Sequence, residues 1–427
     1  MKAKVGLRGG IVAWVITAAL VPTTLVATSP LRPLGGAVAV PARLTYTRFY
    51  IAFAPWCDVL DSLTLMSASQ HVAFLLTLFA AYFLWRLAAT RSSSSTFPLE
   101  TIKGLAFATV VLAVYFVGLL MPRPMASLEL LQRDALAVDF HSHTNASWDG
   151  RRAFSPEWNR SWHRKAGFNA VYISDHGTLA GVIEGEVSNP RTAGEGTAVL
   201  PAVEIRCQGQ HIVILGATIH EGIGDCASAV TTVSSVAEPF HRWESEGMIT
   251  LLTIPGRLAG AHSLPVSQGI EIADGAPRAL DQMQKDSSLI RDIAKVENLA
   301  LVSGSNNHGW GSTAAAWSIL TIPNWRSRTP MALDAAIRAR MGTMRAASVF
   351  VLERRRVAPA SSAIGLSATL PAVAWNMLLT LSAAERVSWL VWTWFLALVI
   401  PLAGRRCRVR LDRAQLIQQQ PRLASRK

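Results

Sequence analysis

The residues best suited to chemistry begin with two histidines one position apart. His141 and His143 directly follow an apolar run, Ala135–Val138, that predicts a β-strand. Because alternate residues of a strand point to the same side, both imidazoles can reach one metal ion. Asp149, in the segment that follows, can bring a carboxylate to the same place. Nine of the ten histidines lie between positions 141 and 308, which indicates a metal site in the middle third of the chain.

Further metal-ligating side chains stand next to the ends of later predicted strands. Short apolar runs alternate with helical patterns along residues 134–356, which predicts an α/β fold with a mostly parallel sheet or barrel. The active sites of such barrels lie at the carboxyl ends of the strands. The residues found there are Asp175, His176, Glu204, His211, Asn306 and His308. Imidazoles combined with carboxylates suit Zn²⁺, Mn²⁺ or Fe²⁺ and suit Ca²⁺ poorly.

The elements that must position these side chains can be delimited from apolar runs and helix caps. Strands are predicted at 135–140, 169–174, 198–205, 211–216, 248–254, 269–272, 299–303, 317–322 and 348–353. Helices are predicted at 156–166, 238–246, 279–297 and 332–341. The first of these helices has a clear start, because Ser155 suits the N-cap and Pro156 the first turn.

Uncharged apolar stretches indicate a membrane protein. Only 16% of the residues are charged, against about 25% in soluble proteins. Stretches at about 9–29, 63–85, 104–121 and 387–404 are long enough, or nearly so, to cross a bilayer. A weaker stretch covers 362–383. We therefore expect an N-terminal membrane region at 1–125, a soluble domain at 134–356, a C-terminal membrane region at 357–404 and a basic tail at 405–427.

The net charge of +13 is concentrated at the two ends of the chain. Basic residues beside apolar segments are typical of cytoplasmic flanks. We expect the tail to contact the lipid bilayer, and we expect no nucleic-acid partner. A cytoplasmic N-terminus followed by three spans places the soluble domain outside the cytoplasm, in an integral protein of a bacterial inner membrane. A hidden early span near 49–59 would instead place the domain in the cytoplasm.

Two features bear on export. The first apolar stretch is expected to be an uncleaved anchor, and a signal peptide is the alternative because basic residues precede it. The four cysteines form no Cys-x-x-Cys pair, so no zinc ribbon or thioredoxin motif is expected. Cys207 and Cys226 are expected to be free buried thiols, and a bond between them is the alternative for an exported domain.

Four motifs resemble, in order, those of the PHP (polymerase and histidinol phosphatase) family. They are Asp-x-His-x-His-Thr at 139–144 with Asp149, Asp-His at 175–176, Glu204 followed by His211, and Gly-Ser-Asn-x-His at 304–308. The resemblance covers about half of the chain. It implies a distorted (β/α)7 barrel, flanked here by transmembrane helices, that holds up to three divalent metal ions and hydrolyses phosphate esters.

The resemblance also implies which residues bind each ion. One ion takes His141, His143, Glu204 and Asn306; a second shares Glu204 and takes His211; a third takes Asp149, His176 and His308. Asn306 stands where the family has Asp, and Ile254 stands where it has a His ligand. We therefore expect two divalent transition-metal ions, because the second of the three positions lacks a ligand.

Other residues are expected to assist. Asp139 and Asp175 would orient imidazoles through their second nitrogen, which gives Asp175 a part in catalysis. Arg257 would bind the substrate phosphate. His163, His220, His241 and His262 match no motif and are not expected to bind metal.

The leading functional hypothesis is a membrane-anchored, metal-dependent phosphoesterase in which a metal-activated water attacks a phosphate ester. The substrate would be a phosphorylated small molecule or a phosphoprotein. One alternative is a catalytically degenerate PHP scaffold that binds metal or ligand in the membrane, which the residues at 254 and 306 favour. Another is a protein-tyrosine phosphatase of exopolysaccharide control.

Overall fold

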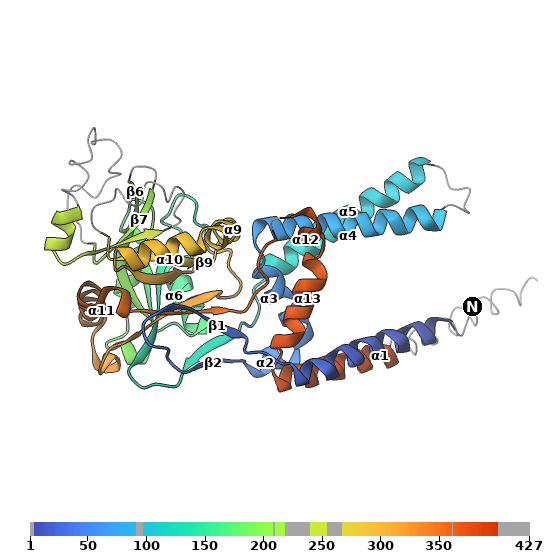
Figure 1. Ribbon diagram of the computed structural model, residues 1–427, viewed down its shortest axis with the longest axis horizontal. Coiled ribbons are helices and arrows are strands. Elements are labelled where there is room, and N and C mark those ends of the chain that lie inside the picture. Colours follow the sequence, from blue (N-terminus) through green and yellow to red (C-terminus); the bar gives the residue numbers. More distant parts are fainter. Residues whose placement is uncertain are drawn as a thin grey trace, which may run out of the picture.

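The structure is a computed structural model that describes residues 4–90, 97–207, 210–217, 240–253, 267–360 and 362–399. A barrel-like body occupies one end of the molecule, and helices project from the other (Figure 1). The candidate metal ligands all belong to the barrel-like body.

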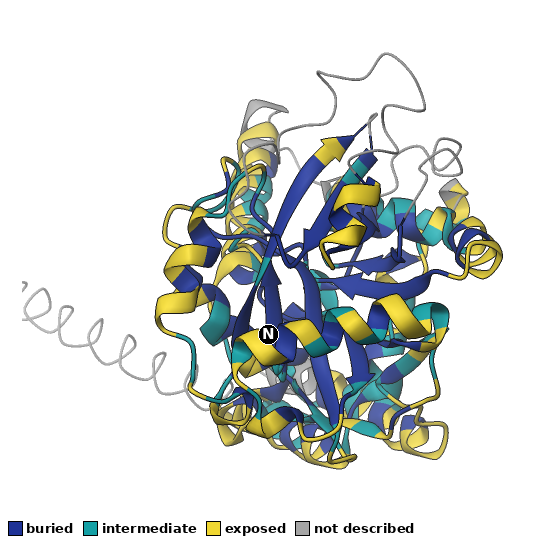
Figure 2. Cartoon of the chain, turned by 90° about the vertical axis from the view of Figure 1, so that its left-hand side faces the viewer, coloured by how far each residue is buried: buried dark blue, intermediate teal, exposed yellow. Residues whose placement is uncertain are grey.

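Ten strands form one mixed sheet, in the order β1-β12-β11-β4-β5-β6-β7-β8-β9-β10. The pairs β4–β5, β5–β6, β8–β9 and β9–β10 are parallel, and the other neighbours are antiparallel. The last strand, β10, also lies against β4 and β11, so the sheet curls almost into a closed barrel (Figure 2). The predicted α/β barrel is confirmed in this mixed form. The strands are β1 (Leu31–Gly36), β4 (Ala135–Ser142), β5 (Ala170–Ile173), β6 (Ala198–Cys207), β7 (Gln210–Leu215), β8 (Ile249–Thr253), β9 (Gly269–Asp274), β10 (Ala300–Gly304), β11 (Ala316–Thr321) and β12 (Phe350–Arg354).

Helices cover the outside of the barrel. They are α6 (Pro156–Ala166), α7 (Ala180–Val187), a helical stretch at 240–245, α9 (Pro277–Lys285), α10 (Ser287–Val296) and α11 (Pro330–Met344). The predicted bounds of α6 are confirmed. Ser155 caps its first turn by accepting from the Trp158 N–H, and Gly167 ends it with a φ of 89°, a value that glycine adopts without strain.

The core lies inside the barrel and under these helices. Every residue of β4 is buried, as expected for a strand covered on both faces. The rings of Phe140 and Tyr172 stack with centroids 5.5 Å apart and join β4 to β5 inside this core. The polar residues at the carboxyl ends of these strands are thereby fixed on a rigid frame.

The projecting helices include α1 (Lys4–Leu25), α4 (Ala68–Thr90), α5 (Phe97–Leu120) and a helix at 383–399. Among the described residues, α4 and α5 contain the two helical stretches long and apolar enough to cross a membrane, Ala68–Ala88 and Thr101–Leu120. The apolar part of α1, Gly10–Leu25, is shorter. It runs beside the 383–399 helix (Figure 1), where Trp14 and Trp394 meet edge to face at 5.3 Å.

Two weaker membrane spans find no support. The early region holds α2 (Arg48–Ala52) and α3 (Ala54–Thr64), and the region of 362–383 holds α12 (Ala363–Ser367) and α13 (Thr369–Thr380). The longest of these four helices has 12 residues, whereas a spanning helix needs about 20. The predicted span at 387–404 lies partly outside the described residues.

The segment that follows α1 contributes to the barrel. β1 pairs antiparallel with β12, and β2 (Ala42–Thr45) pairs with β3 (Ser127–Leu130) in a small second sheet. The sheet therefore includes residues that the sequence analysis assigns to the membrane region, and β1 covers an edge that the segment 134–356 would leave open.

Two predictions, about one helix and one cysteine, are wrong. The single helix expected at 279–297 is two helices, α9 and α10, which meet at Asp286. Cys207 is disulfide-bonded and not a free thiol, and its expected alternative partner, Cys226, lies outside the described residues. Cys57 is a free, buried thiol.

Candidate metal centre

Glu204 lies where four imidazoles converge. Its Oε2 is 3.2 Å from His141 Nε2, from His143 Nε2 and from His176 Nδ1, and its Oε1 is 2.6 Å from His211 Nδ1. The side chain is only 1% exposed. A buried carboxylate ringed by ring nitrogens is the donor set that transition-metal ions prefer. The structure therefore brings together five of the predicted ligands.

The strand order explains this convergence. His141 lies at the carboxyl end of β4 and His143 just beyond it, while Glu204 lies on β6, two strands away in the sheet. His176 follows β5, between them, and forms an isolated parallel bridge with Glu204. His211 comes from the antiparallel neighbour β7, where it pairs with Arg206. Neighbouring strand ends thus deliver all five side chains to one point.

A second group adjoins the first. The rings of His143 and His308 stack with centroids 4.0 Å apart, and His143, His176 and His308 are close enough to share one ion. Asp149 completes the group, with Oδ1 at 3.1 Å from His308 Nδ1 and Oδ2 at 3.4 Å from His176 Nε2. His308 Nδ1 is buried and makes no hydrogen bond, although Asp149 Oδ1 lies 3.1 Å away. A metal ion bound by these two atoms would give the nitrogen the partner that it lacks.

Burial and neighbouring side chains shift the pKa values of Glu204 and His143. Burial raises the pKa of Glu204, but the charge on His141 and the hydrogen bonds of His141, His143 and His211 outweigh it and hold the pKa well below its usual value. Burial lowers the pKa of His143 to about 3, against the opposing pull of Glu204. His143 is therefore neutral and has a free lone pair, the state in which a histidine ligates metal.

His141 is the exception among the imidazoles. Burial lowers its pKa, but the charges of Glu204 and Glu271 raise it well above its usual value. Its Nε2 faces Glu204 and its Nδ1 lies 3.4 Å from Glu271 Oε1. The two carboxylates therefore favour a proton on this ring. A metal ion that binds His141 would displace that proton.

Two carboxylates of β9, Glu271 and Asp274, were missed by the sequence analysis. With His141 they form a third group that could hold an ion. His141 Nδ1 contacts Glu271 while Nε2 faces the main centre, so Glu271 is placed to orient this ring, as carboxylates commonly do for metal-bound histidines. The position of Asp274 at the carboxyl end of its strand was the signal that could have found it.

The two aspartates expected to orient ligand imidazoles do not contact them. Asp139 Oδ2 lies 2.6 Å from Nε2 of His163, a buried histidine outside the centre. Asp175 accepts hydrogen bonds from the N–H and the hydroxyl of Thr144 at 2.6 and 2.7 Å. Burial raises the pKa of Asp175 to about 6. Both aspartates fix the loops that carry the ligands, and Arg257 lies outside the described residues.

Asn306 links the loop after β10 to β9. Its φ of 44° is left-handed, a conformation that Asn tolerates better than most residues. Its Nδ2 donates to Asp274 Oδ2 at 2.9 Å, and its Oδ1 lies 2.9 Å from His308 Nε2. The side-chain hydrogen bonds of Asn306 thus go to His308 and Asp274, and not to His141, His143 or Glu204, with which the resemblance groups it.

Replacing Asn306 by Asp is expected to tighten metal binding by roughly tenfold, because a carboxylate adds a negative charge beside the ion. Burial and the charge of Glu271 raise the pKa of Asp274 to about 8, so at neutral pH its protonated carboxyl can donate to the new carboxylate. Chelator competition at fixed pH measures the change. Asn324→Asp is the matched control, since this exposed asparagine also has a positive φ of 54°. Equal affinities would show that position 306 does not face the ions.

Comparisons with known proteins give low similarity. No protein-family model matches the chain, and no curated protein matches it. Among solved structures, PsfC from Pseudomonas syringae PB-5123 is 16% identical over 49% of this chain and 96% of its own, with a TM-score of 0.35. A two-domain protein of Bacteroides vulgatus containing a predicted PHP-like metal-dependent phosphoesterase is 17% identical over 47% of this chain and 63% of its own, with a TM-score of 0.30. The lesion-specific endonuclease PfuEndoQ of Pyrococcus furiosus is 12% identical over 48% and 56%, with a TM-score of 0.34.

These identities and TM-scores do not bear on the activity or the substrate of this protein. The absence of a nucleic-acid partner stays a prediction.

Proposed function

We propose that this protein is a membrane-anchored, metal-dependent phosphoesterase. The observation that carries the proposal is the convergence of four imidazoles on buried Glu204, with Asp149 and His308 beside them. Such a donor set suits Mn²⁺, Zn²⁺ or Fe²⁺. We propose two ions, one held by His141, His143 and Glu204 and the other by Asp149, His176 and His308.

When bound, such ions supply a nucleophilic water at neutral pH and stabilise the charge that develops on a transferring phosphoryl group. The chain's own residues prepare the site for this chemistry. Glu271 fixes the ring of His141, and Ser147 donates to Asp149 Oδ1 at 3.0 Å. The side chains of His176, His211 and Asp149 are 16%, 22% and 30% exposed, whereas those of His141 and His143 are fully buried. Substrate would therefore enter on the side of the exposed three. Arg257 is proposed to bind its phosphate.

The proposed membrane location rests on α4 and α5. We place the barrel outside the cytoplasm of a bacterial inner membrane. The disulfide at Cys207 supports this side, because disulfides persist in oxidising compartments and are rare in the cytosol. The substrate would be a phosphorylated small molecule or a phosphoprotein from that compartment.

A degenerate scaffold is the second candidate. Asn306 engages Asp274 and His308 with its amide, and it brings no charge to the centre. A protein that binds metal without turnover would tolerate this. The other alternative is a protein-tyrosine phosphatase of exopolysaccharide control. It is tested by including a tyrosine phosphate among the esters in the hydrolysis assay.

The test is the replacement of one ligand from each proposed ion. His143→Ala and His176→Ala in the full-length protein are each expected to lower Mn²⁺-dependent hydrolysis of p-nitrophenyl phosphate by about 10³-fold, since each loses charge stabilisation of several kcal/mol. Metal analysis is expected to fall from two ions per chain toward one. His241→Ala, at an exposed position outside the centre, is the control. Equal activity in all three variants would refute an enzyme that uses this centre, and metal binding without turnover in the parent would favour the scaffold.

A further inference from the structure

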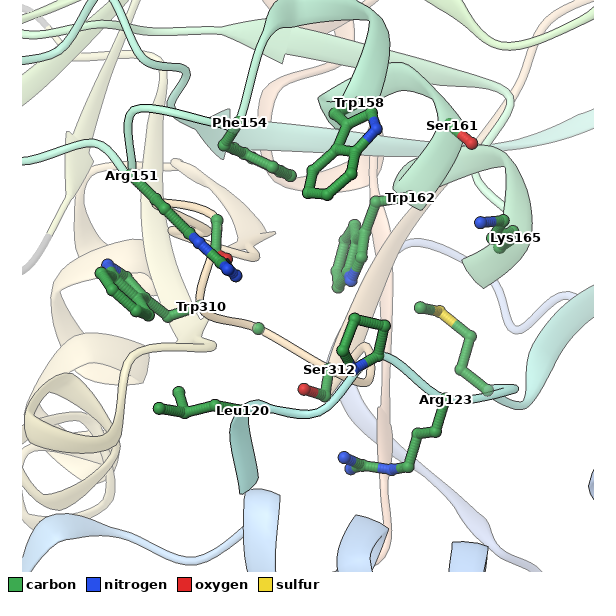
Figure 3. Close-up of a pocket in the computed structure, with 14 residues that line it drawn as sticks. Leu120, Arg123, Arg151, Phe154, Trp158, Ser161, Trp162, Lys165, Trp310 and Ser312 are labelled. Atoms are coloured by element: carbon green, nitrogen blue, oxygen red, sulfur yellow. Dashed lines mark hydrogen bonds between the residues drawn. The ribbon is translucent and has the colours of Figure 1, made fainter. Parts of the chain in front are cut away.

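A pocket lies where the end of α5 meets the loop after β10 (Figure 3). Its volume is about 190 Å³. Aromatic and basic side chains dominate its walls, and none of the described residues that line it is acidic. The lining residues include Arg151, Trp158, Ser161, Trp162, Lys165 and Trp310.

One wall holds an indole N–H without a partner. Trp162 is only 9% exposed, and its Nε1 is buried with no hydrogen bond. The indoles of Trp317 and Trp325 each donate to a backbone carbonyl at 3.0 Å. Buried N–H groups are nearly always paired. Figure 3 shows the Trp162 ring among the side chains that line the pocket, and its N–H is a donor without an acceptor in the protein.

The charge around the pocket is positive. The guanidinium of Arg151 lies 5.2 Å from the centroid of the Trp310 ring, and Lys165 is exposed. A third cation, Arg123, is already neutralised by Asp61 at 3.0 Å. Two basic groups therefore remain for an anion, beside the apolar faces of Trp158 and Trp310, which are both about half exposed.

The pocket shares a wall with the metal centre. The Arg151 N–H donates to the carbonyl of His308 at 2.9 Å, and Gly309, the next residue, lines the pocket. The pocket is also lined by Leu120, the last residue of the apolar stretch Thr101–Leu120. Tryptophans at the end of an apolar helix are typical of a membrane surface. The pocket thus joins the end of a candidate span to the loop that carries a metal ligand.

We propose that this pocket binds the hydrocarbon end of a lipid phosphate ester, with Arg151 holding the phosphate at the metal side and Trp162 donating to an ester oxygen. This rests on the proposed phosphoesterase function and names its substrate class. Water attacks phosphorus, the bond from phosphorus to the lipid oxygen breaks, and the lipid alcohol and phosphate leave with the water's two protons shared between them. The pocket is smaller than the roughly 300–1,000 Å³ of complete small-molecule sites, so it holds part of one chain.

The experiment compares ethyl phosphate with octyl phosphate on the full-length, Mn²⁺-loaded protein in one detergent, with phosphate release as the readout. The pocket holds only part of the octyl chain, and about three buried methylenes at roughly fourfold each are expected to favour octyl phosphate in kcat/KM by on the order of 10²-fold. Ser161→Phe, which fills the pocket from half-buried Ser161 on α6, should bring the ratio of the two kcat/KM values down to a few-fold. Arg151→Gln should lower turnover of both esters, and Arg152→Gln, at the exposed neighbour, should not.

Trp162→Phe removes the N–H together with two ring carbons. It should lower octyl phosphate turnover several-fold, and its melting temperature should fall less than that of Trp317→Phe, because the Trp162 N–H has no partner in the protein whereas the Trp317 N–H donates to the Ala166 carbonyl. A fall in melting temperature equal to that of other core tryptophans would contradict the assigned role.

The outcomes separate the pocket from the reaction. The lipid pocket is overturned if ethyl phosphate is hydrolysed with no preference for octyl phosphate, or if Ser161→Phe keeps the preference of the parent protein. Either result leaves the phosphoesterase function intact. Octyl phosphate binding by tryptophan fluorescence that Ser161→Phe abolishes, with no ester hydrolysed, supports the pocket and overturns the phosphoesterase. If octyl phosphate is neither bound nor hydrolysed, both the lipid pocket and the phosphoesterase function are overturned.

Discussion

Glu204→Gln is expected to lower metal-dependent phosphate ester hydrolysis by at least about 10³-fold and to reduce the bound metal to less than one ion per chain. Among the described residues, Glu204 is the side chain that contacts four candidate ligand imidazoles, at 2.6 to 3.2 Å. The amide keeps the shape of the carboxylate but removes its charge and presents an N–H₂ toward one of the rings. Loss of charge stabilisation of about 4 kcal/mol corresponds to about 10³-fold in rate.

Glu184→Gln, at an exposed position on α7, is the matched control and should keep parental metal content and rate. Folding is checked by the melting temperature of the metal-free proteins, so that a loss of activity is assigned to the centre and not to unfolding. A Glu204→Gln protein with two tightly bound ions would exclude Glu204 as a ligand, and the proposed centre would then be wrong.

The sequence contained enough information for the centre because strand ends are easy to locate. The buried strand β4 is apolar up to His141 except at Asp139, and Pro156 and Gly167 mark both ends of the following helix. Strand ends then predict which side chains converge. The structure places the predicted ligands in one cluster of side chains, with His211 joined through Glu204, Asp149 through His308 and His176, and Asn306 through His308.

The missed features depend on long-range pairing. β1 contains Pro33 and two glycines at 35 and 36, which indicate a loop when no partner is known. It is a strand because it lies at the sheet edge against β12, where proline is tolerated. No proline or glycine in the sequence marks the break between α9 and α10 at Asp286. Glu271 lies in an alternating apolar and polar run that predicts a solvent-facing carboxylate, whereas barrel closure buries it.

A buried ion cluster ties the helical region to the barrel. Asp61 of α3 accepts from Arg123, after α5, at 3.0 Å and from Arg354, at the end of β12, at 2.7 Å. Tyr50 and Thr313 donate to the same carboxylate at 3.2 and 3.3 Å. The side chains of Asp61 and Arg123 are 1% and 2% exposed. Thr313 belongs to the loop that follows His308, so the cluster also anchors the segment that leads to the metal centre.

Asp61→Asn is expected to destabilise the full-length protein by about 3–5 kcal/mol, because it leaves two guanidinium groups buried without a counter-charge. The melting temperature in detergent, followed by tryptophan fluorescence, should fall on the order of 10 °C. Glu129→Gln is the control, since Glu129 and Arg43 form an ion pair at 2.7 Å that is largely exposed, and exposed pairs contribute little. Equal melting temperatures in the two variants would show that water reaches Asp61 and that the helical region is not held to the barrel through this carboxylate. A large fall confined to Asp61→Asn, with metal affinity lowered in the variant that remains folded, would show that the helical region and the metal centre are coupled through the loop that contains Thr313.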